Sequence, residues 1–221
     1  GPIDPISSGF LGRGITTASD SGYEFLIISL DTPGGTLQDT RDIVELLLAS
    51  PIPVIVYVSP SGARAASAGT FITSAAHVAV MAPTTSIGAA SPIMSVGEDL
   101  PETIKDKVME DTAALLRGIA SRRDRNSDAL ERTVLEATSY TAAEALELGV
   151  VDIVAEDLED LLVQLDGRTV QLETGPTTLK AEGVHVATIS KTLVERFLGV
   201  IANPDIAFLL LAVGGVGLLI E

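Results

Sequence analysis

Residues 25–35 read Phe-Leu-Ile-Ile-Ser-Leu-Asp-Thr-Pro-Gly-Gly, an apolar run followed at once by a glycine-rich turn. A short apolar run that ends in such a turn is typical of a strand buried on both faces of a parallel sheet. Similar runs lie at residues 53–58 and 78–81, and helix-compatible sequence separates the three, at residues 36–49 and 65–76. This alternation predicts an α/β fold with a parallel sheet and crossover helices.

The later sequence continues the alternation. The elements expected there are a helix over 101–123, a helix from 141 to about Gly149, a strand at 150–154, a short amphipathic helix over 157–165, and a small β excursion within 166–188. The helix at 141 is indicated by Thr141-Ala142-Ala143-Glu144, a capping box in which the first and last side chains satisfy backbone N–H groups of the first turn.

The C-terminal segment differs in kind from the rest. Residues 206–220 carry no charge, and a membrane-spanning helix needs ~20 apolar residues. We interpret residues 205–221 as the start of a transmembrane helix, truncated by the end of the chain, and residues 189–204 as an amphipathic linker helix. The alternative is a buried core helix. Residues 1–188 then form the folded domain, and the start at Gly1 indicates a processed or engineered end.

Composition excludes several classes of function. The chain has 221 residues with 14 basic and 30 acidic side chains, a net charge of −16, so nucleic acid is not an expected partner. Cysteine is absent and the two histidines lie far apart, which argues against a metal site or a thiolate nucleophile. We expect no cofactor. Because hydrophobic residues make up 46% of the chain and aromatic residues only 4%, the core must be aliphatic.

Two small-residue segments follow the first two strands and are the candidates for chemistry. Gly34 and Gly35 allow close approach of the backbone to a ligand, and their N–H groups suit a developing negative charge. Ser67 stands where the next helix begins, with the Ala68 N–H beside it, which is a favourable position for a nucleophile. The alternative is that Ser67 only caps the helix.

A serine nucleophile needs a base. His77 lies ten residues further on, about 15 Å along the same helix at 1.5 Å per residue, and His185 lies in the expected β excursion, so neither suits a triad. A lysine whose pKa is lowered by burial is the other option. Lys107 lies among apolar positions of the 101–123 helix; the alternative is an ordinary surface lysine.

These motifs occur together in one known arrangement. The chain resembles the Clp protease/crotonase superfold, with its stacked βαβ superhelix, and more closely the protease domain of long-form NfeD proteins, membrane-bound serine proteases encoded beside stomatins. The resemblance covers nearly the whole chain. Its motifs are Asp31-Thr32-Pro33-Gly34-Gly35, Ala66-Ser67-Ala68-Gly69-Thr70, Thr85-Ser86-Ile87-Gly88-Ala89-Ala90, Arg125-Asn126, the segment 139–152, Leu165-Asp166-Gly167 and the segment 201–208.

The resemblance implies a Ser–Lys dyad with Ser67 as nucleophile and Lys107 as general base, Lys105 being the rival if the register differs. It implies an oxyanion hole formed by the N–H groups of Gly35 and Ala68. The position where Clp peptidases carry a histidine reads Ala-Ser-Pro at 90–92, which favours lysine. Small residues predict a groove for hydrophobic peptides, formed by Gly34, Ala66, Gly69, Ile87, Gly88 and Ala89.

The expected function is therefore a membrane-associated serine endopeptidase that cleaves hydrophobic segments of stomatin-like or other membrane proteins. The resemblance also implies a homo-oligomer, a dimer or higher, and a protease domain outside the cytoplasm at the cell membrane. A polar, turn-rich stretch at 94–102 predicts a loop that orders over the site. The rival functions are a crotonase-like acyl-CoA enzyme and a non-catalytic scaffold that binds a stomatin-like partner.

Overall fold

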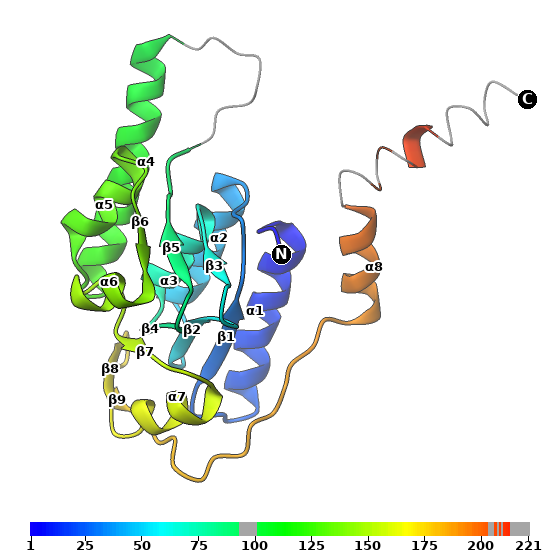
Figure 1. Cartoon of the computed structure of the whole chain (residues 1–221). Helices are drawn as coiled ribbons and strands as arrows, with labels where there is room; N and C mark the ends of the chain where they lie inside the picture. Colours follow the sequence, from blue (N-terminus) through cyan, green and yellow to red (C-terminus); the bar gives the residue numbers. More distant parts are fainter. Residues whose placement is uncertain (93–100, 203–205, 207, 209, 213–221) are drawn as a thin grey trace, which may run out of the picture.

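The computed structural model describes residues 1–92, 101–202, 206, 208 and 210–212 (Figure 1). Its elements in chain order are α1 (Pro5–Asp20), β1 (Leu26–Leu30), α2 (Leu37–Leu48), β2 (Val54–Val58), β3 (Arg64–Ala65), α3 (Ala68–Ala75), β4 (Val78–Met81), β5 (Ser86–Gly88), α4 (Glu102–Arg122), α5 (Ser127–Leu135), β6 (Ser139–Thr141), α6 (Ala142–Glu147), β7 (Ile153–Val154), α7 (Leu158–Leu165), β8 (Thr169–Leu172), β9 (Gly175–Thr178) and α8 (Leu193–Ile201).

A parallel four-stranded sheet in the order β1-β2-β4-β7 forms the centre of the domain. Every residue of β2 is buried, because this strand lies inside the sheet with side chains packed on both faces. Alternate β2 residues point to opposite faces. Val56 joins the larger core with α2 and α3, whereas Ile55 and Tyr57 pack with α7. The predicted α/β fold with a parallel sheet is confirmed, and so are the buried strands β2 and β4. The prediction that β1 is buried on both faces is wrong, because β1 lies at the edge of the sheet and Ser29 within it is exposed.

A second, smaller sheet in the order β3-β5-β6 lies next to the carboxyl end of β1. Within it, Ala65 of β3 pairs in parallel with Ile87 of β5, and Ile87 pairs antiparallel with Tyr140 of β6. A single bridge between Thr32 and Ala65 connects the chain that leaves β1 to this sheet. The glycine-rich turn and the start of α3 are therefore held together by backbone pairing.

Most predicted helices are present. The structure contains α2, α4, α6 and α7 close to their expected ranges. The capping box at the start of α6 is formed in both directions: the Glu144 N–H donates to Thr141 Oγ1 at 3.3 Å, and the Thr141 N–H donates to Glu144 Oε2 at 2.9 Å. Gly149 follows that helix with φ +71°, as expected for a residue that ends it.

The helix expected to start near Ser67 does so: Ser67 is its N-cap residue and Ala68 its first residue, while residues 64–65 of the helix-compatible stretch form β3. Two other predicted boundaries are wrong. The strand expected at 150–154 is reduced to 153–154, since the Val150 and Val151 N–H groups donate to Ala145 O and close the end of α6. The β excursion within 166–188 consists of the hairpin β8–β9 alone.

The sequence analysis missed α1, α5 and the second sheet. The first of these, α1, starts with an Asp4 cap whose side chain accepts from the Ser7 N–H, and Pro5 occupies its first turn. Only three of its sixteen residues are buried, Gly14, Ile15 and Ala18. With so few large apolar side chains, α1 shows little of the periodicity by which a helix is recognised.

Among the described residues, no helix is long and apolar enough to cross a membrane. The predicted transmembrane segment at 205–221 lies largely outside those residues, and so does most of the predicted loop at 94–102. The helix α8 falls within the range 189–204 assigned to an amphipathic linker. The domain boundaries themselves stay a prediction.

Candidate active site

Ser67 occupies an unusual backbone conformation at the start of α3. Its φ is +50° and its ψ is −113°, in a region that non-glycine residues rarely adopt. The conformation is fixed on both sides, because the Ser67 N–H donates to Ala89 O at 2.8 Å and the Ser67 carbonyl accepts from the Thr70 N–H at 2.9 Å. The side chain makes no capping hydrogen bond. Ser67 thus stands at the N-cap position of α3, but its hydroxyl does not cap the helix.

The glycine-rich turn after β1 lies directly against this serine. A β-carbon on Gly34 would come within 2.7 Å of Ser67 Cβ and 3.1 Å of Ser67 Oγ, and the φ of Gly34 is +119°. The buried side chain of Thr32 holds the turn in place, since the Gly34 N–H donates to Thr32 Oγ1 at 3.0 Å. The sequence analysis did not single out Thr32, although it lies inside the quoted Asp-Thr-Pro-Gly-Gly motif.

The two predicted oxyanion donors flank Ser67 in the fold. Ala68 is the first residue of α3, so its N–H has no partner within the helix. Gly35 packs against Ile3, whose N–H donates to Gly34 O at 2.9 Å. Within the described part of the chain, no hydrogen bond is made by the N–H of Gly35 or of Ala68. Neither N–H therefore has a competing partner in the described chain, as an oxyanion donor requires.

The residues predicted to line a groove are placed unequally. Ala66 and Ala89 are half-buried beside Ser67, as a groove wall would be. Gly69 and Ile87 are buried, and a β-carbon on Gly69 would lie 2.7 Å from Thr32 Cγ2. Gly88, also buried, packs against the backbone of residue 138. These three residues support the wall from behind.

The lysines lie away from this centre. Lys105 and Lys107 are in the first two turns of α4, which project beyond the body of the domain (Figure 1), and both are exposed. Among the described residues, no hydrogen bond or ion pair connects either lysine to Ser67. The buried position expected for a lysine base is not occupied by Lys107 in this arrangement. The sequence alone does not show how far α4 places Lys107 from Ser67.

The histidines take no part in the site. His77 follows α3, where its Nδ1 accepts from the Val54 N–H at 3.1 Å. Burial, together with the nearby Arg123 and Arg125 guanidinium groups, lowers the pKa of His77 from 6.5 to about 3. The imidazole is therefore neutral near pH 7, and it serves as a structural acceptor for the sheet. The expectation that His77 is not the base agrees with this placement.

Two arginines, the buried Arg125 and the half-buried Arg123, brace the far end of α3. Arg125 donates to Ser74 O and Ala76 O, both at 3.0 Å, and forms an ion pair with Asp152 at 2.9 Å. Arg123 donates to Ala75 O at 2.8 Å. Guanidinium groups at a helix C-terminus satisfy its free carbonyls and interact favourably with its dipole. The helix that carries Ser67 is thus fixed at both ends.

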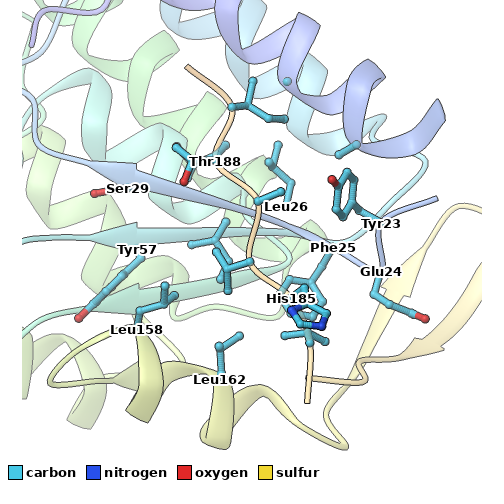
Figure 2. A pocket seen from close by; sticks show the side chains of 18 of the residues that line it. Tyr23, Glu24, Phe25, Leu26, Ser29, Tyr57, Leu158, Leu162, His185 and Thr188 are labelled. Atoms are coloured by element: carbon cyan, nitrogen blue, oxygen red, sulfur yellow. The ribbon is translucent and has the colours of Figure 1, made fainter. Parts of the chain in front are cut away.

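A large apolar cavity in the described part of the chain lies elsewhere. It has a volume of about 700 Å³ and lies between α1, the edge strand β1, α7 and residues 184–189. Its walls are mainly apolar, with Phe25, Leu26, Leu158 and Leu162 directed inward and His185 at one end (Figure 2). Ser67 is not among its lining residues. We assign the candidate chemistry to Ser67 on its geometry, and cavity size does not bear on that assignment.

Comparison with solved structures shows the same fold in protease domains. A lysine-to-alanine variant of 1510-N, named as a membrane-bound stomatin-specific protease in complex with a substrate peptide, matches with a TM-score of 0.83 at 34% identity and covers 90% of this chain and 93% of that one. A serine-to-alanine variant of the same protease matches with a TM-score of 0.81, at 34% identity, over 86% of this chain and 94% of that one. The chain therefore has the α/β fold of the 1510-N domain, which is named as a membrane-bound protease.

Sequence comparison gives the family. The model of the NfeD1b N-terminal domain matches residues 2–174, and the chain belongs to that family. It is 36% identical to the membrane-bound protease PH1510 of Pyrococcus horikoshii over 206 residues, 91% of this chain and 46% of that protein. It is 27% identical to the membrane protein NfeD1b of Bacillus subtilis over 221 residues, which are 96% of this chain and 47% of that protein. The chain spans about half the length of these relatives.

Proposed function

We propose that this chain is the protease domain of a membrane-associated serine endopeptidase with Ser67 as its nucleophile. The observation that carries the proposal is the strained backbone of Ser67. This residue is held against Gly34, and its hydroxyl makes no capping hydrogen bond to α3. Strain at a non-glycine residue persists only where surrounding structure fixes it, and such residues cluster at active sites. The relative PH1510, whose 1510-N domain has the same fold, is named as a protease.

In the proposed reaction, unprotonated Lys107 takes the hydroxyl proton of Ser67 as Oγ attacks a peptide carbonyl carbon. The N–H groups of Gly35 and Ala68 hold the oxyanion of the tetrahedral intermediate. The Lys107 ammonium then gives its proton to the leaving amine, and an acyl-enzyme remains on Ser67. Water attacks the acyl-enzyme with Lys107 again as base, which releases the acid and restores the serine.

Spacing supports Lys107 over Lys105 as the base. The serine and lysine replaced in the two 1510-N variants are residues 97 and 138 of that protein, 41 positions apart. Ser67 and Lys107 are 40 positions apart, and Ser67 and Lys105 are 38. Because Lys107 is exposed here, the proposal requires the start of α4 to move over the site when substrate binds, as closing elements of many enzymes do.

The proposed substrate is a hydrophobic segment of a stomatin-like or other membrane protein. The half-buried Ala66 and Ala89 beside Ser67 leave space for such a peptide, and 1510-N is named as specific for a stomatin homologue. We further propose a cell-membrane location through the apolar C-terminal segment, with the protease domain on the extracytoplasmic side, and assembly into a homo-oligomer.

The test is incubation of the chain with a library of hydrophobic peptides, with products identified by mass spectrometry. Cleavage by the parent that is lost in both Ser67→Ala and Lys107→Ala supports the dyad. Cleavage that survives Lys107→Ala but not Lys105→Ala moves the base by half a turn of α4. Cleavage that survives Ser67→Ala overturns the assignment of the nucleophile.

A second candidate function is a non-catalytic scaffold that holds a stomatin-like partner at the membrane. The observation that favours it is the separation of Lys107 from Ser67 among the described residues. Catalytic groups are often loosely arranged before substrate binds, so this separation alone does not decide. Peptide binding without cleavage by the parent chain, retained in Ser67→Ala, would favour the scaffold.

A further inference from the structure

The helix α8 presents a continuous apolar surface that no other described element covers. None of its residues is buried. Its large side chains are all strongly exposed, by between 39% and 83%: Leu193, Val194, Phe197, Leu198, Val200 and Ile201. At 100° per residue these six positions share one broad face of the helix, opposite Glu195 and Gly199. A soluble surface helix would normally turn such a face to a core.

The polar side of α8 is instead the side fixed to the protease domain. Glu195 forms an ion pair with Arg13 of α1 at 2.7 Å, and Arg13 also donates to Ser190 O at 3.1 Å. The charged groups of Arg13 and Lys191 both lie over the ring of Phe10, at 5.3 Å and 5.8 Å from its centroid. Because these contacts use the face that carries Glu195, the apolar face is held outward.

We propose that α8 lies in the plane of a lipid bilayer, with this apolar face in the acyl-chain boundary, and that the Arg13–Glu195 pair sets how the protease domain stands on the membrane. An interfacial helix of this kind combines a wide apolar face with basic residues at headgroup level. The proposal deepens the membrane association given above and does not depend on peptide hydrolysis.

Two observations favour lipid over a second protein as the occupant. The chain carries a net charge of −16, yet Lys191 and Arg196 flank the apolar face, and the acidic Glu195 near them is paired with Arg13. Basic residues beside an apolar face suit anionic headgroups. The exposed apolar surface also continues past α8 to Phe208 and Leu211, within a sequence that carries no charge from residue 206 to 220.

The absence of tryptophan from the chain gives a clean test, since Phe197→Trp introduces a single reporter on the proposed face. With vesicles of phosphatidylethanolamine and phosphatidylglycerol we expect a blue shift of its emission and strong quenching by lipids brominated near the headgroups. The matched control is Val163→Trp on α7, which is 73% exposed on another surface and should show neither effect.

A second pair of measurements separates lipid from the alternatives. Replacing Leu193 and Val194 by serine in the Phe197→Trp chain should weaken vesicle binding by about tenfold or more per residue, since burial of each aliphatic side chain contributes about 1.5–3 kcal/mol.

The absence of an emission shift with vesicles overturns the proposal. A shift without lipid that grows with protein concentration also overturns it and assigns the face to a second copy. Ser67→Ala should bind vesicles like the parent, which keeps the outcome separate from that of the protease assay.

Discussion

Gly34 and Ser67 are in such close contact that no side chain fits between them. A β-carbon on Gly34 would lie 2.7 Å from Ser67 Cβ, closer than real β-carbons approach, and the φ of Gly34 is +119°. Glycine is thus required here twice, by its backbone conformation and by its neighbour. The contact joins the turn that carries one proposed oxyanion donor to the proposed nucleophile.

Gly34→Ala should therefore impair the site more than the fold. The new methyl group must push Ser67 away from its position, and misplacement by about 1 Å costs roughly 100-fold in rate. The measurement is the rate of peptide cleavage, or of Ser67 labelling by a fluorophosphonate, beside the free energy of unfolding. Gly22→Ala is the matched control, because Gly22 has a φ of +72° but nothing within 4 Å of its added methyl. Equal loss of labelling in both variants would contradict the proposed contact.

Thr32→Val tests the role of the Thr32 hydroxyl separately from that of its methyl group. Valine keeps the shape but removes the acceptor of the Gly34 N–H, and an unsatisfied buried donor costs about 1–3 kcal/mol. We expect a lower kcat with little change in KM, because the turn that carries Gly35 loses its support. Thr32→Ser retains the acceptor and should restore kcat, although it loses the methyl contact with Gly69. A Thr32→Ser variant as slow as Thr32→Val would show that the hydroxyl does not position the turn.

His77 should make stability depend on pH. Its pKa is lowered to about 3 in the folded chain, by burial and by two arginines, from 6.5 when unfolded. Between these values the unfolded state binds a proton that the folded state does not, so stability is complete above pH 6.5 and falls as pH decreases. One such proton gives a slope of at most about 1.4 kcal/mol per pH unit. Denaturant unfolding between pH 7.5 and 5 is expected to reveal this slope.

The control for that slope is His77→Asn, which offers a neutral acceptor to the Val54 N–H and does not titrate in this range. Its free energy of unfolding should be nearly flat between pH 7.5 and 5. If the parent and His77→Asn show the same pH dependence, the groups responsible are the carboxylates and His77 is not the source.

The fold was predictable where burial is encoded locally. The run at 53–58 is apolar throughout because β2 is covered on both faces, and the capping box at Thr141 marks the start of a helix by its own chemistry. The second sheet was not predictable, because β3 and β5 contain two and three residues and exist only by pairing across the chain. Likewise α1 buries mainly small residues, so its sequence shows only a weak apolar periodicity.

The candidate site divides in the same way. Ser67 and Gly34 were recognisable from small-residue motifs at the ends of strands. Their mutual contact, and the support from Thr32, depend on how two turns far apart in the sequence meet. The position of Lys107 relative to Ser67 depends on how α4 leaves the domain, which no local motif encodes. The pairing of these two residues stays a prediction.

Arg125 should be the charged residue whose loss destabilises the domain most clearly. Its side chain is 2% exposed, and it holds the carbonyls of residues 74 and 76 together with Asp152. Removal of one partner from a buried ion pair costs about 3–5 kcal/mol, because the other charge and its acceptors are left uncompensated. We expect the free energy of unfolding to fall by about 3 kcal/mol in Arg125→Met, since Asp152 itself is partly exposed.

Arg132→Met is the control: its pair with Glu136 is more than half exposed, and such pairs contribute about 0–1 kcal/mol. Because Arg125 fixes the end of α3 opposite Ser67, fluorophosphonate labelling should also slow in Arg125→Met under conditions where the chain remains folded. Unfolding curves that coincide for the two variants would show that α3 does not depend on this arginine.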